Sequence, residues 1–185
     1  MTFDDFYALV VARRTQLVMD QERDVDVDLI NTLCRTAAWA PNHQQTWPWL
    51  FGVFTGEGRR GLGEVTAEAM QRNGDTELKV TKTRTKYMRS PVLLVVGTAQ
   101  GESELQTQEN RDAVAAGIQN LLLGATAMGL GSFWSSCPKG ANDDVGKHCG
   151  WPESTHITAM IYLGWPTRTL PERERPEPAI TYFNS

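Results

Sequence analysis

Apolar residues recur at helical spacing at the start of the chain, at Phe3, Phe6, Tyr7, Val10 and Val11. This periodicity predicts a helix over residues 3–13. Asp26 is placed to cap a second helix, which Pro41 ends because the residue before a proline disfavours the helical conformation. Two further helices are predicted over residues 59–72 and 76–88.

The longest predicted helix runs from residue 104 to 128 and carries a stripe of small residues. Ala113, Gly117 and Gly124 recur there at helical spacing. The distance between two packed helices depends on the side chains at their contact, so small residues allow a close approach. We therefore expect another helix to pack tightly on this one.

Strand patterns occupy residues 49–54, 91–98, 132–135 and 157–163. Residues 91–98 are apolar on both faces, as is typical of a strand buried within a sheet. A short helix is expected over residues 142–149. This mixture of helices and strands predicts a single layered domain of the α/β or α+β class, with the long helix at its centre.

The end of the chain has a different composition. Residues 167–178 are rich in proline and charge, and residues 179–183 are strand formers. We expect residues 1–166 to form the domain and residues 167–185 to form an arm that packs on a partner subunit and adds a strand to its sheet. A frayed tail is the alternative.

Composition and charge bound the class of protein. The 185 residues fit one domain, and 41% hydrophobic residues can build a core. The net charge of -4 gives no electrostatic reason to expect nucleic acid or an anionic membrane as a partner. The longest apolar run, residues 91–97, is too short to cross a bilayer, and Asp4 and Asp5 stand where a leader would be positive. We expect a cytoplasmic protein.

The three cysteines are an odd number without paired spacing, which argues against a disulfide framework and fits a reducing compartment. Candidate metal ligands are Cys137, His148, Cys149 and His156. Adjacent histidine and cysteine residues lack the separation of a zinc-ligand pair. Buried free thiols are the simpler interpretation, and we expect no metal site.

Arg13 and Arg14, at the end of the first predicted helix, are candidates for binding a phosphate. Guanidinium groups match phosphate oxygens in a bidentate manner, and the Thr15 hydroxyl is within reach of the same anion. Arginines that only satisfy the last helix carbonyls are the alternative. No Walker A motif is present, and Gly129 and Gly131 follow a predicted helix, whereas the glycines of a nucleotide-binding loop precede one.

A polar turn and an aromatic run follow the second predicted helix. The amide groups of Asn42 and Gln44, beside His43, suit the alternating donors and acceptors of a flavin pyrimidine edge. Trp47 and Trp49 could wall a flat pocket, although Trp49 starts a strand and is expected in the core. The alternative is a turn-forming asparagine in a polar loop. An arginine pair that could bind a phosphate, together with aromatic side chains that could line a flat pocket, suggests flavin mononucleotide (FMN).

No hydrolytic triad can be assembled, because residues 135–137 lack a nucleophile-elbow pattern. We expect no catalytic side chain, since in flavin chemistry the cofactor carries the reaction.

In this order the motifs resemble the nitroreductase family of FMN enzymes, and the small branch of bacterial NAD(P)H nitroreductases within it. The resemblance covers nearly the whole chain and rests on five segments, Arg13–Thr15, Ala40–His43, Ala115–Leu122, Met128–Trp134 and Tyr162–Pro166. It implies an α+β fold with a central, mostly antiparallel sheet flanked by helices. It also implies an intertwined homodimer in which the C-terminal arms exchange a strand and two FMN sites lie at the interface.

The resemblance further assigns site residues. Arg13, Arg14 and Thr15 would contact the ribityl phosphate, and Trp39 and His43 would reach FMN from the partner subunit. The phosphate and ring end of the pocket would be lined by Trp134, Ser135 and Ser136. Residues 127–132 are a weaker candidate for contacting NADH or NADPH.

Two residues depart from the branch pattern. Trp39 and Ser135 stand where basic residues are expected, so either the binding of phosphate or NADPH would be weaker, or Lys139 or Arg168 would take over that binding. Trp39 could instead stack on the flavin or narrow the substrate pocket.

These observations predict an FMN-dependent NAD(P)H oxidoreductase. We expect ping-pong hydride transfer through flavin N5 to nitroaromatics, quinones or similar small-molecule acceptors. Two alternatives stay open: a flavin-sequestering protein of the same fold with little turnover, and an interaction module without flavin.

Overall fold

The computed structural model describes residues 2–171 and 173–183. One four-stranded sheet lies at its centre, built from β1 (Trp49–Thr55), β2 (Val92–Thr98), β3 (Gly131–Ser135) and β4 (His156–Gly164). The strand order is β1-β2-β4-β3, and every neighbouring pair is antiparallel. This confirms the predicted α+β class with a mostly antiparallel central sheet.

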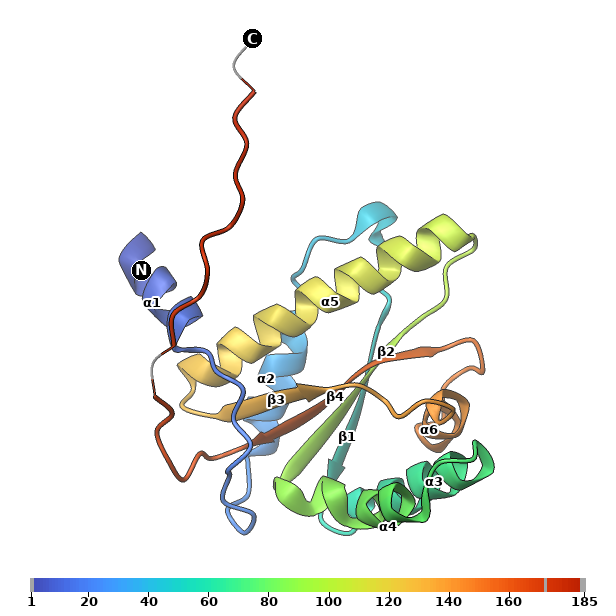
Figure 1. Cartoon of the computed structure of the whole chain (residues 1–185). Helices are drawn as coiled ribbons and strands as arrows, with labels where there is room; N and C mark the ends of the chain where they lie inside the picture. The colour runs from blue at the N-terminus through green and yellow to red at the C-terminus, as the bar shows by residue number, and fades with distance from the viewer. Residues whose placement is uncertain (1, 172, 184–185) are drawn as a thin grey trace.

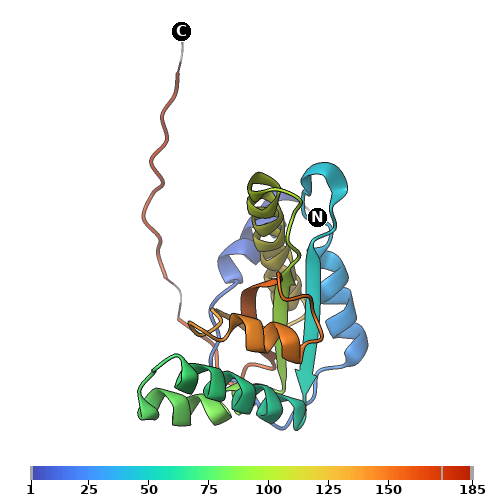
Figure 2. The same cartoon turned by 90° about the vertical axis from the view of Figure 1, so that its right-hand side faces the viewer.

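Helices cover both faces of the sheet (Figures 1 and 2). On one face lie α2 (Val27–Ala37) and α5 (Glu104–Ala127). The opposite face is covered by α3 (Gly58–Arg72) and α6 (Asn142–His148), and α4 (Glu77–Lys86) packs on α3. Two short 3-10 helices, η1 (His43–Gln45) and η2 (Tyr87–Arg89), complete the layers. Helix α1 (Phe3–Ala12) projects from this body.

The central strand β2 holds the two layers together. All seven of its residues are buried, as its apolar pattern predicted. Leu94 and Val96 pack into the cluster with α2 and α5, while Leu93 and Val95 pack into the cluster on the other face. Alternate side chains of a strand point to opposite faces, so a strand that is apolar at every position fits only between two covered faces.

The helices and the four strands predicted within residues 1–166 are all present, with ends shifted by a few residues. The Asp26 carboxylate accepts a hydrogen bond of 2.7 Å from the Asp28 N–H, which caps α2 as expected. That helix ends at Ala37, four residues before Pro41, and a turn follows it. The predicted helix over residues 76–88 divides into α4 and the 3-10 turn η2.

Helices α2 and α5 approach one another closely at the small residues of α5. A methyl group added at Gly117 would lie 2.6 Å from the Ala37 carbonyl oxygen. At Gly124 it would lie 2.9 Å from a methyl carbon of Leu33. Both distances are shorter than a van der Waals contact. At Gly117 the neighbour is backbone, so only glycine fits there, whereas at Gly124 the end of the Leu33 side chain would have to shift. This confirms the predicted tight packing on the long helix.

Two segments lie outside the layered body. None of the residues of α1 is buried, and the side chains of Phe3 and Tyr7 are 75% and 60% exposed. Residues 173–183 form no regular secondary structure, and Phe183 is 92% exposed. The predicted strand over 179–183 has no pairing partner within the chain, so its addition to a partner's sheet stays a prediction. Residues 172 and 184–185 of the predicted arm lie outside the described part.

None of the helices within residues 2–171 and 173–183 is long and apolar enough to cross a membrane.

The helix contact at Gly117 predicts that alanine substitutions at two different glycines have opposite effects on stability. We expect Gly117→Ala to lower the free energy of unfolding by about 1–3 kcal/mol, because its methyl group would overlap the Ala37 carbonyl and the Trp49 indole nitrogen. Gly61, within α3, has nothing within 4 Å of such a methyl group. Gly61→Ala should therefore raise stability by about 0.5–1 kcal/mol. Urea unfolding at one protein concentration measures both, and equal stability of Gly117→Ala and wild type would refute the close contact.

Candidate active site

The segment that follows α1 runs along the free edge of β3. Thr15 forms a parallel bridge with Ser132, and the Gln16 N–H donates to the Ser132 carbonyl oxygen at 2.9 Å. Met19 pairs with Pro166 just beyond the end of β4. These contacts bring the predicted arginine pair beside the strand that carries Trp134 and Ser135.

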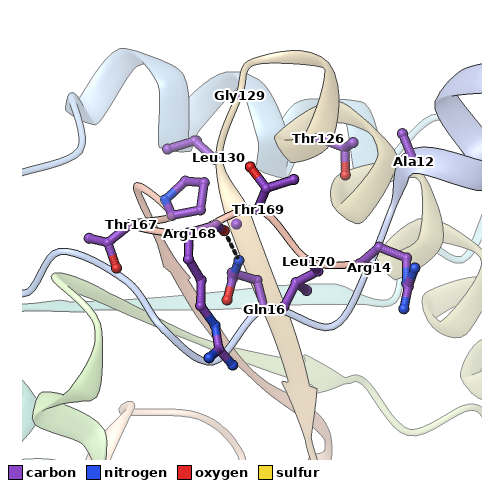
Figure 3. Close-up of a pocket in the computed structure, with 12 residues that line it drawn as sticks. Ala12, Arg14, Gln16, Thr126, Gly129, Leu130, Thr167, Arg168, Thr169 and Leu170 are labelled. Atoms are coloured by element: carbon purple, nitrogen blue, oxygen red, sulfur yellow. Dashed lines mark hydrogen bonds between the residues drawn. The ribbon is translucent and has the colours of Figure 1, made fainter. Parts of the chain in front are cut away.

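A pocket of about 470 Å³ opens next to this segment (Figure 3). Three parts of the chain line it: Ala12 to Gln16, the end of α5 with the following turn, and residues 166–170. The Gln16 side-chain amide donates to the Arg168 carbonyl oxygen at 3.0 Å, and this bond joins the first and last of these parts. The pocket therefore depends on chain segments that are about 150 residues apart in sequence.

The pocket and its surroundings are rich in arginine. Arg14 and Arg168 line it directly. Burial lowers the pKa of the Arg13 guanidinium, and the positive charges of Arg175 and Arg14 lower it further. Within the described residues none of these four arginines forms an ion pair with a carboxylate. A guanidinium stays charged in a protein, so the cluster is a concentration of positive charge that an anion would relieve.

The donor set of the pocket suits a phosphate. The Arg14 side chain donates one hydrogen bond to the Pro171 carbonyl oxygen at 2.8 Å. A guanidinium has five N–H donors, so others stay available to an anion. Thr126, Thr167 and Thr169 contribute further lining residues that carry hydroxyl groups. Arginine forks and hydroxyls are the groups that bind phosphate oxygens most effectively.

Trp134, Ser135 and Ser136 do not line this pocket; they lie at and just past the far end of β3. Thr15 pairs with Ser132, and Ser135 lies three residues farther along the strand, a distance of about 10 Å at the usual rise per residue. Trp134 is 38% exposed and faces away from the core. An extended ligand with its anionic end among the arginines could follow this edge toward Ser135 and Ser136.

The other predicted site residues lie elsewhere. Trp39 is 86% exposed in the turn after α2, and His43 and Gln44 belong to η1. This loop contacts the first turns of α5, through Gln106 and Asn110, whereas the pocket is formed at the last turn, at Thr126. The sixteen residues from Asn110 to Thr126 correspond to about 24 Å of helix. One chain therefore does not bring Arg14 and His43 together.

Hydrogen bonds inside the loop already engage two of the predicted amide groups. The Asn42 side chain donates to the Thr46 hydroxyl at 2.9 Å and accepts from the Trp47 N–H at 2.8 Å. The Gln44 side-chain oxygen accepts from Gln106 at 2.8 Å. The exposed His43 imidazole and Trp39 indole carry no such bond among the described residues. A direct contact of Asn42 or Gln44 with a flavin stays a prediction.

Arg168 is the pocket residue that the sequence indicated only weakly. It lies in the proline-rich arm and was expected to contribute only as a replacement, with Lys139, for the basic residues that are missing at Trp39 and Ser135. Its place in the lining of the pocket follows from the Met19–Pro166 pairing and the Gln16–Arg168 hydrogen bond, which no local sequence pattern predicts.

The comparison of the chain with protein families agrees with this geometry. The sequence pattern of the Nitroreductase family matches residues 10–165. The chain belongs to the nitroreductase family. This confirms the family that the motifs suggested. The matched range includes both arginines of the pair, the 39–47 loop and all four strands.

A relative in Bacillus subtilis (strain 168), "Putative NAD(P)H nitroreductase YfhC", is 27% identical over 169 residues, which cover 90% of this chain and 87% of that protein.

Solved structures of the same fold include several flavoproteins. A nitroreductase-like family protein from Bacillus cereus superposes with a TM-score of 0.80 at 24% identity, covering 96% of this chain and 94% of the other. A nitroreductase with bound FMN from Bacteroides fragilis superposes with a TM-score of 0.78 at 21% identity, covering 96% and 98%. The FMN-dependent nitroreductase NfnB of Mycobacterium smegmatis, solved in complex with NADPH, gives 0.72 at 16% identity, covering 89% of each.

The cysteines lie apart from the arginine pocket and are free thiols. Burial raises the pKa of Cys34 and Cys149 to about 11 and that of Cys137 to about 12. No cluster of three or more histidine, cysteine or acidic residues with metal-binding geometry occurs in the described part of the chain.

Thiol reactivity tests this description. The thiolate is the reactive form, and a raised pKa keeps all three groups protonated at pH 8, so we expect the folded protein to react slowly with a disulfide reagent. The rate should rise only as the pH approaches about 11. In urea at pH 8 all three should react rapidly, since an exposed cysteine has a pKa of about 8.5. A fast-reacting thiol in the folded protein at pH 8 would contradict the burial.

Proposed function

We propose that this protein is an FMN-dependent NAD(P)H oxidoreductase that reduces nitroaromatics, quinones or similar small acceptors. The observation that carries the proposal is the arginine-lined pocket at the edge of β3, in a chain of the nitroreductase family. The Bacteroides fragilis relative binds FMN on the same fold, and the Mycobacterium smegmatis relative is FMN-dependent and was solved with NADPH. FMN and a nicotinamide nucleotide are thus the cofactors that the relatives support.

Within one chain, the phosphate of FMN would be held by Arg14 and Arg168. Arg13 adds positive charge beside them, and Thr15 fixes the segment on β3 through its pairing with Ser132. The ring end of the cofactor would follow the edge of β3 toward Ser135 and Ser136, beside Trp134. These are small or aromatic residues, which suit the approach of a planar ring.

The partner subunit would supply Trp39 and His43. The separation along α5 prevents these residues from reaching the arginine pocket of their own chain, whereas a second copy placed in the opposite direction could bring its loop there. Exposed apolar side chains on α1 and on residues 179–183 fit a homodimer interface, because isolated monomers rarely leave such patches uncovered. We infer that residues 1–166 form the domain and that the arm packs on the partner.

FMN held in this pocket would supply the chemistry of hydride transfer between NADH or NADPH and an acceptor that binds in the same place. The side chains of the protein bind and orient the reactants. Trp39 and Trp134 are exposed aromatic groups that would limit the acceptor space to flat molecules. The three free thiols fit a reducing compartment such as the cytoplasm.

An absorption spectrum of the purified protein tests the function directly. We expect the bands of oxidised flavin, or their appearance after FMN is added, and their bleaching by NADPH or NADH without oxygen. A bound flavin that neither nucleotide bleaches would favour a sequestering protein of the same fold. Absence of any flavin after reconstitution would overturn the proposal.

Substitution of the pocket arginines tests the phosphate site. We expect Arg14→Ala and Arg168→Ala each to weaken FMN binding by about 10- to 100-fold, which corresponds to the loss of one charge-assisted hydrogen bond. Arg14→Lys should recover only part of the affinity, because an ammonium lacks the bidentate fork. Arg60→Ala is the control, since Arg60 is exposed on α3 and pairs with Glu57. Quenching of flavin fluorescence measures the dissociation constants, and wild-type affinity in both alanine variants would refute the assignment.

A further inference from the structure

The loop between α2 and β1 has an unusual backbone. Gln44, Gln45 and Trp47 adopt φ angles of 56°, 53° and 50°, and no other described residue except glycine has a positive φ. Side chains with a Cβ atom disfavour this left-handed region, so the conformation persists only where surrounding contacts impose it. The exposed Trp39 lies at the start of this loop and His43 lies within it. The conformation of the loop therefore determines where these two side chains point.

A chain of three hydrogen bonds runs from the loop into the body of the protein. The Trp47 N–H donates to the Asn42 side-chain oxygen at 2.8 Å, and the Asn42 amide donates to the Thr46 hydroxyl at 2.9 Å. The Thr46 hydroxyl in turn donates to the Asn110 side-chain oxygen at 2.6 Å. Every polar group in this chain therefore has the partner that its donor or acceptor role requires.

Asn110 is the residue at which this series of hydrogen bonds ends in the body of the protein. It lies on α5 and is 2% exposed, which is rare for an asparagine. Its amide nitrogen donates to the Ala99 carbonyl oxygen at 3.1 Å, just past the end of β2. One side chain thus connects the long helix, the central strand and the loop. A buried amide with both ends satisfied fixes its neighbours in a single arrangement.

We propose that Asn110 is a positioning residue for the flavin site of the partner subunit, acting through Thr46 and Asn42 to hold the loop that presents Trp39 and His43. The inference rests on the proposed function, because it requires a flavin site completed by two chains. It assigns a role in cofactor binding to a residue that lies about 24 Å along α5 from the pocket of its own chain.

The middle of the hydrogen-bond chain offers the cleanest substitution. Thr46→Val keeps the shape of the side chain and removes the hydroxyl that joins Asn42 to Asn110. We expect FMN to dissociate about tenfold more readily from this variant, with an unchanged dimer mass. Thr46→Ser keeps the hydroxyl and should bind FMN as the wild type does. Thr32→Val removes an exposed hydroxyl from α2 and is the control for threonine substitution in general.

Asn110→Leu tests the anchor itself, with the melting temperature recorded to detect unfolding. Should this variant fail to fold, Thr46→Val carries the test alone, because it leaves Asn110 and its bond to Ala99 in place. Wild-type FMN affinity in Thr46→Val would overturn the proposal.

A mixed dimer separates action on the partner from action within one chain. An Arg14→Ala subunit and a Thr46→Val subunit are coexpressed with two different affinity tags, and the heterodimer is isolated and titrated with FMN. If the loop acts on the partner, one site contains both the Arg14→Ala pocket and the Thr46→Val loop. The other site then contains neither substitution. We therefore expect one site of wild-type affinity per heterodimer and one weak site.

Two weak sites in the heterodimer would mean that the loop serves its own chain, and would overturn the inference while leaving the proposed function intact. Failure of the proposed function is a different result, since the wild-type protein would then take up no flavin before any variant is made.

Discussion

The length and rigidity of α5 constrain the rest of the molecule. Its 24 residues form a rod about 36 Å long that packs on α2 and on one face of the sheet. The arginine pocket lies at its last turn and the 39–47 loop at its first turns. Because the rise per residue of a helix is fixed, these two regions stay apart in one chain. A site that uses both must be assembled from two chains.

The packing of α2 on α5 fixes this arrangement. The contact at Gly117 brings the Ala37 carbonyl to the surface of the long helix, and the 39–47 loop begins two residues after Ala37. The loop is then tied to α5 a second time through Thr46 and Asn110. Both ends of the loop are thus held against α5, which leaves little conformational freedom to the exposed residues between them. This pre-organisation is what a binding group supplied in trans needs, since ordering it on binding would cost affinity.

The opposite end of the molecule is organised by charge and by long-range pairing. The segment after α1 and the start of the arm meet beside β3 and concentrate four arginines there. Positive charges held close together repel each other, and such an arrangement persists where a bound anion compensates it. The exposed apolar face of α1 lies next to this pocket, because α1 ends at Ala12, which lines it. The exposed apolar face and the arginine-lined pocket therefore share one region of the surface.

The sequence by itself determined the elements and the kind of chemistry. Helical periodicity located α1, α2 and α5, the uninterrupted apolar run located β2, and Asp26 marked a helix start, because these signals depend on the local backbone. The arginine pair and the order of five motifs indicated the family and a phosphate-bearing cofactor.

Only the tertiary structure decided which of these residues meet. The hydrogen bonds between Gln16 and Arg168 and between Thr46 and Asn110 join residues 152 and 64 positions apart. Such contacts follow from how helices and strands pack, and no local pattern encodes them. For the same reason the sequence could not show that Arg168 joins the pocket, or that the amides of Asn42 and Gln44 are already bonded within the chain.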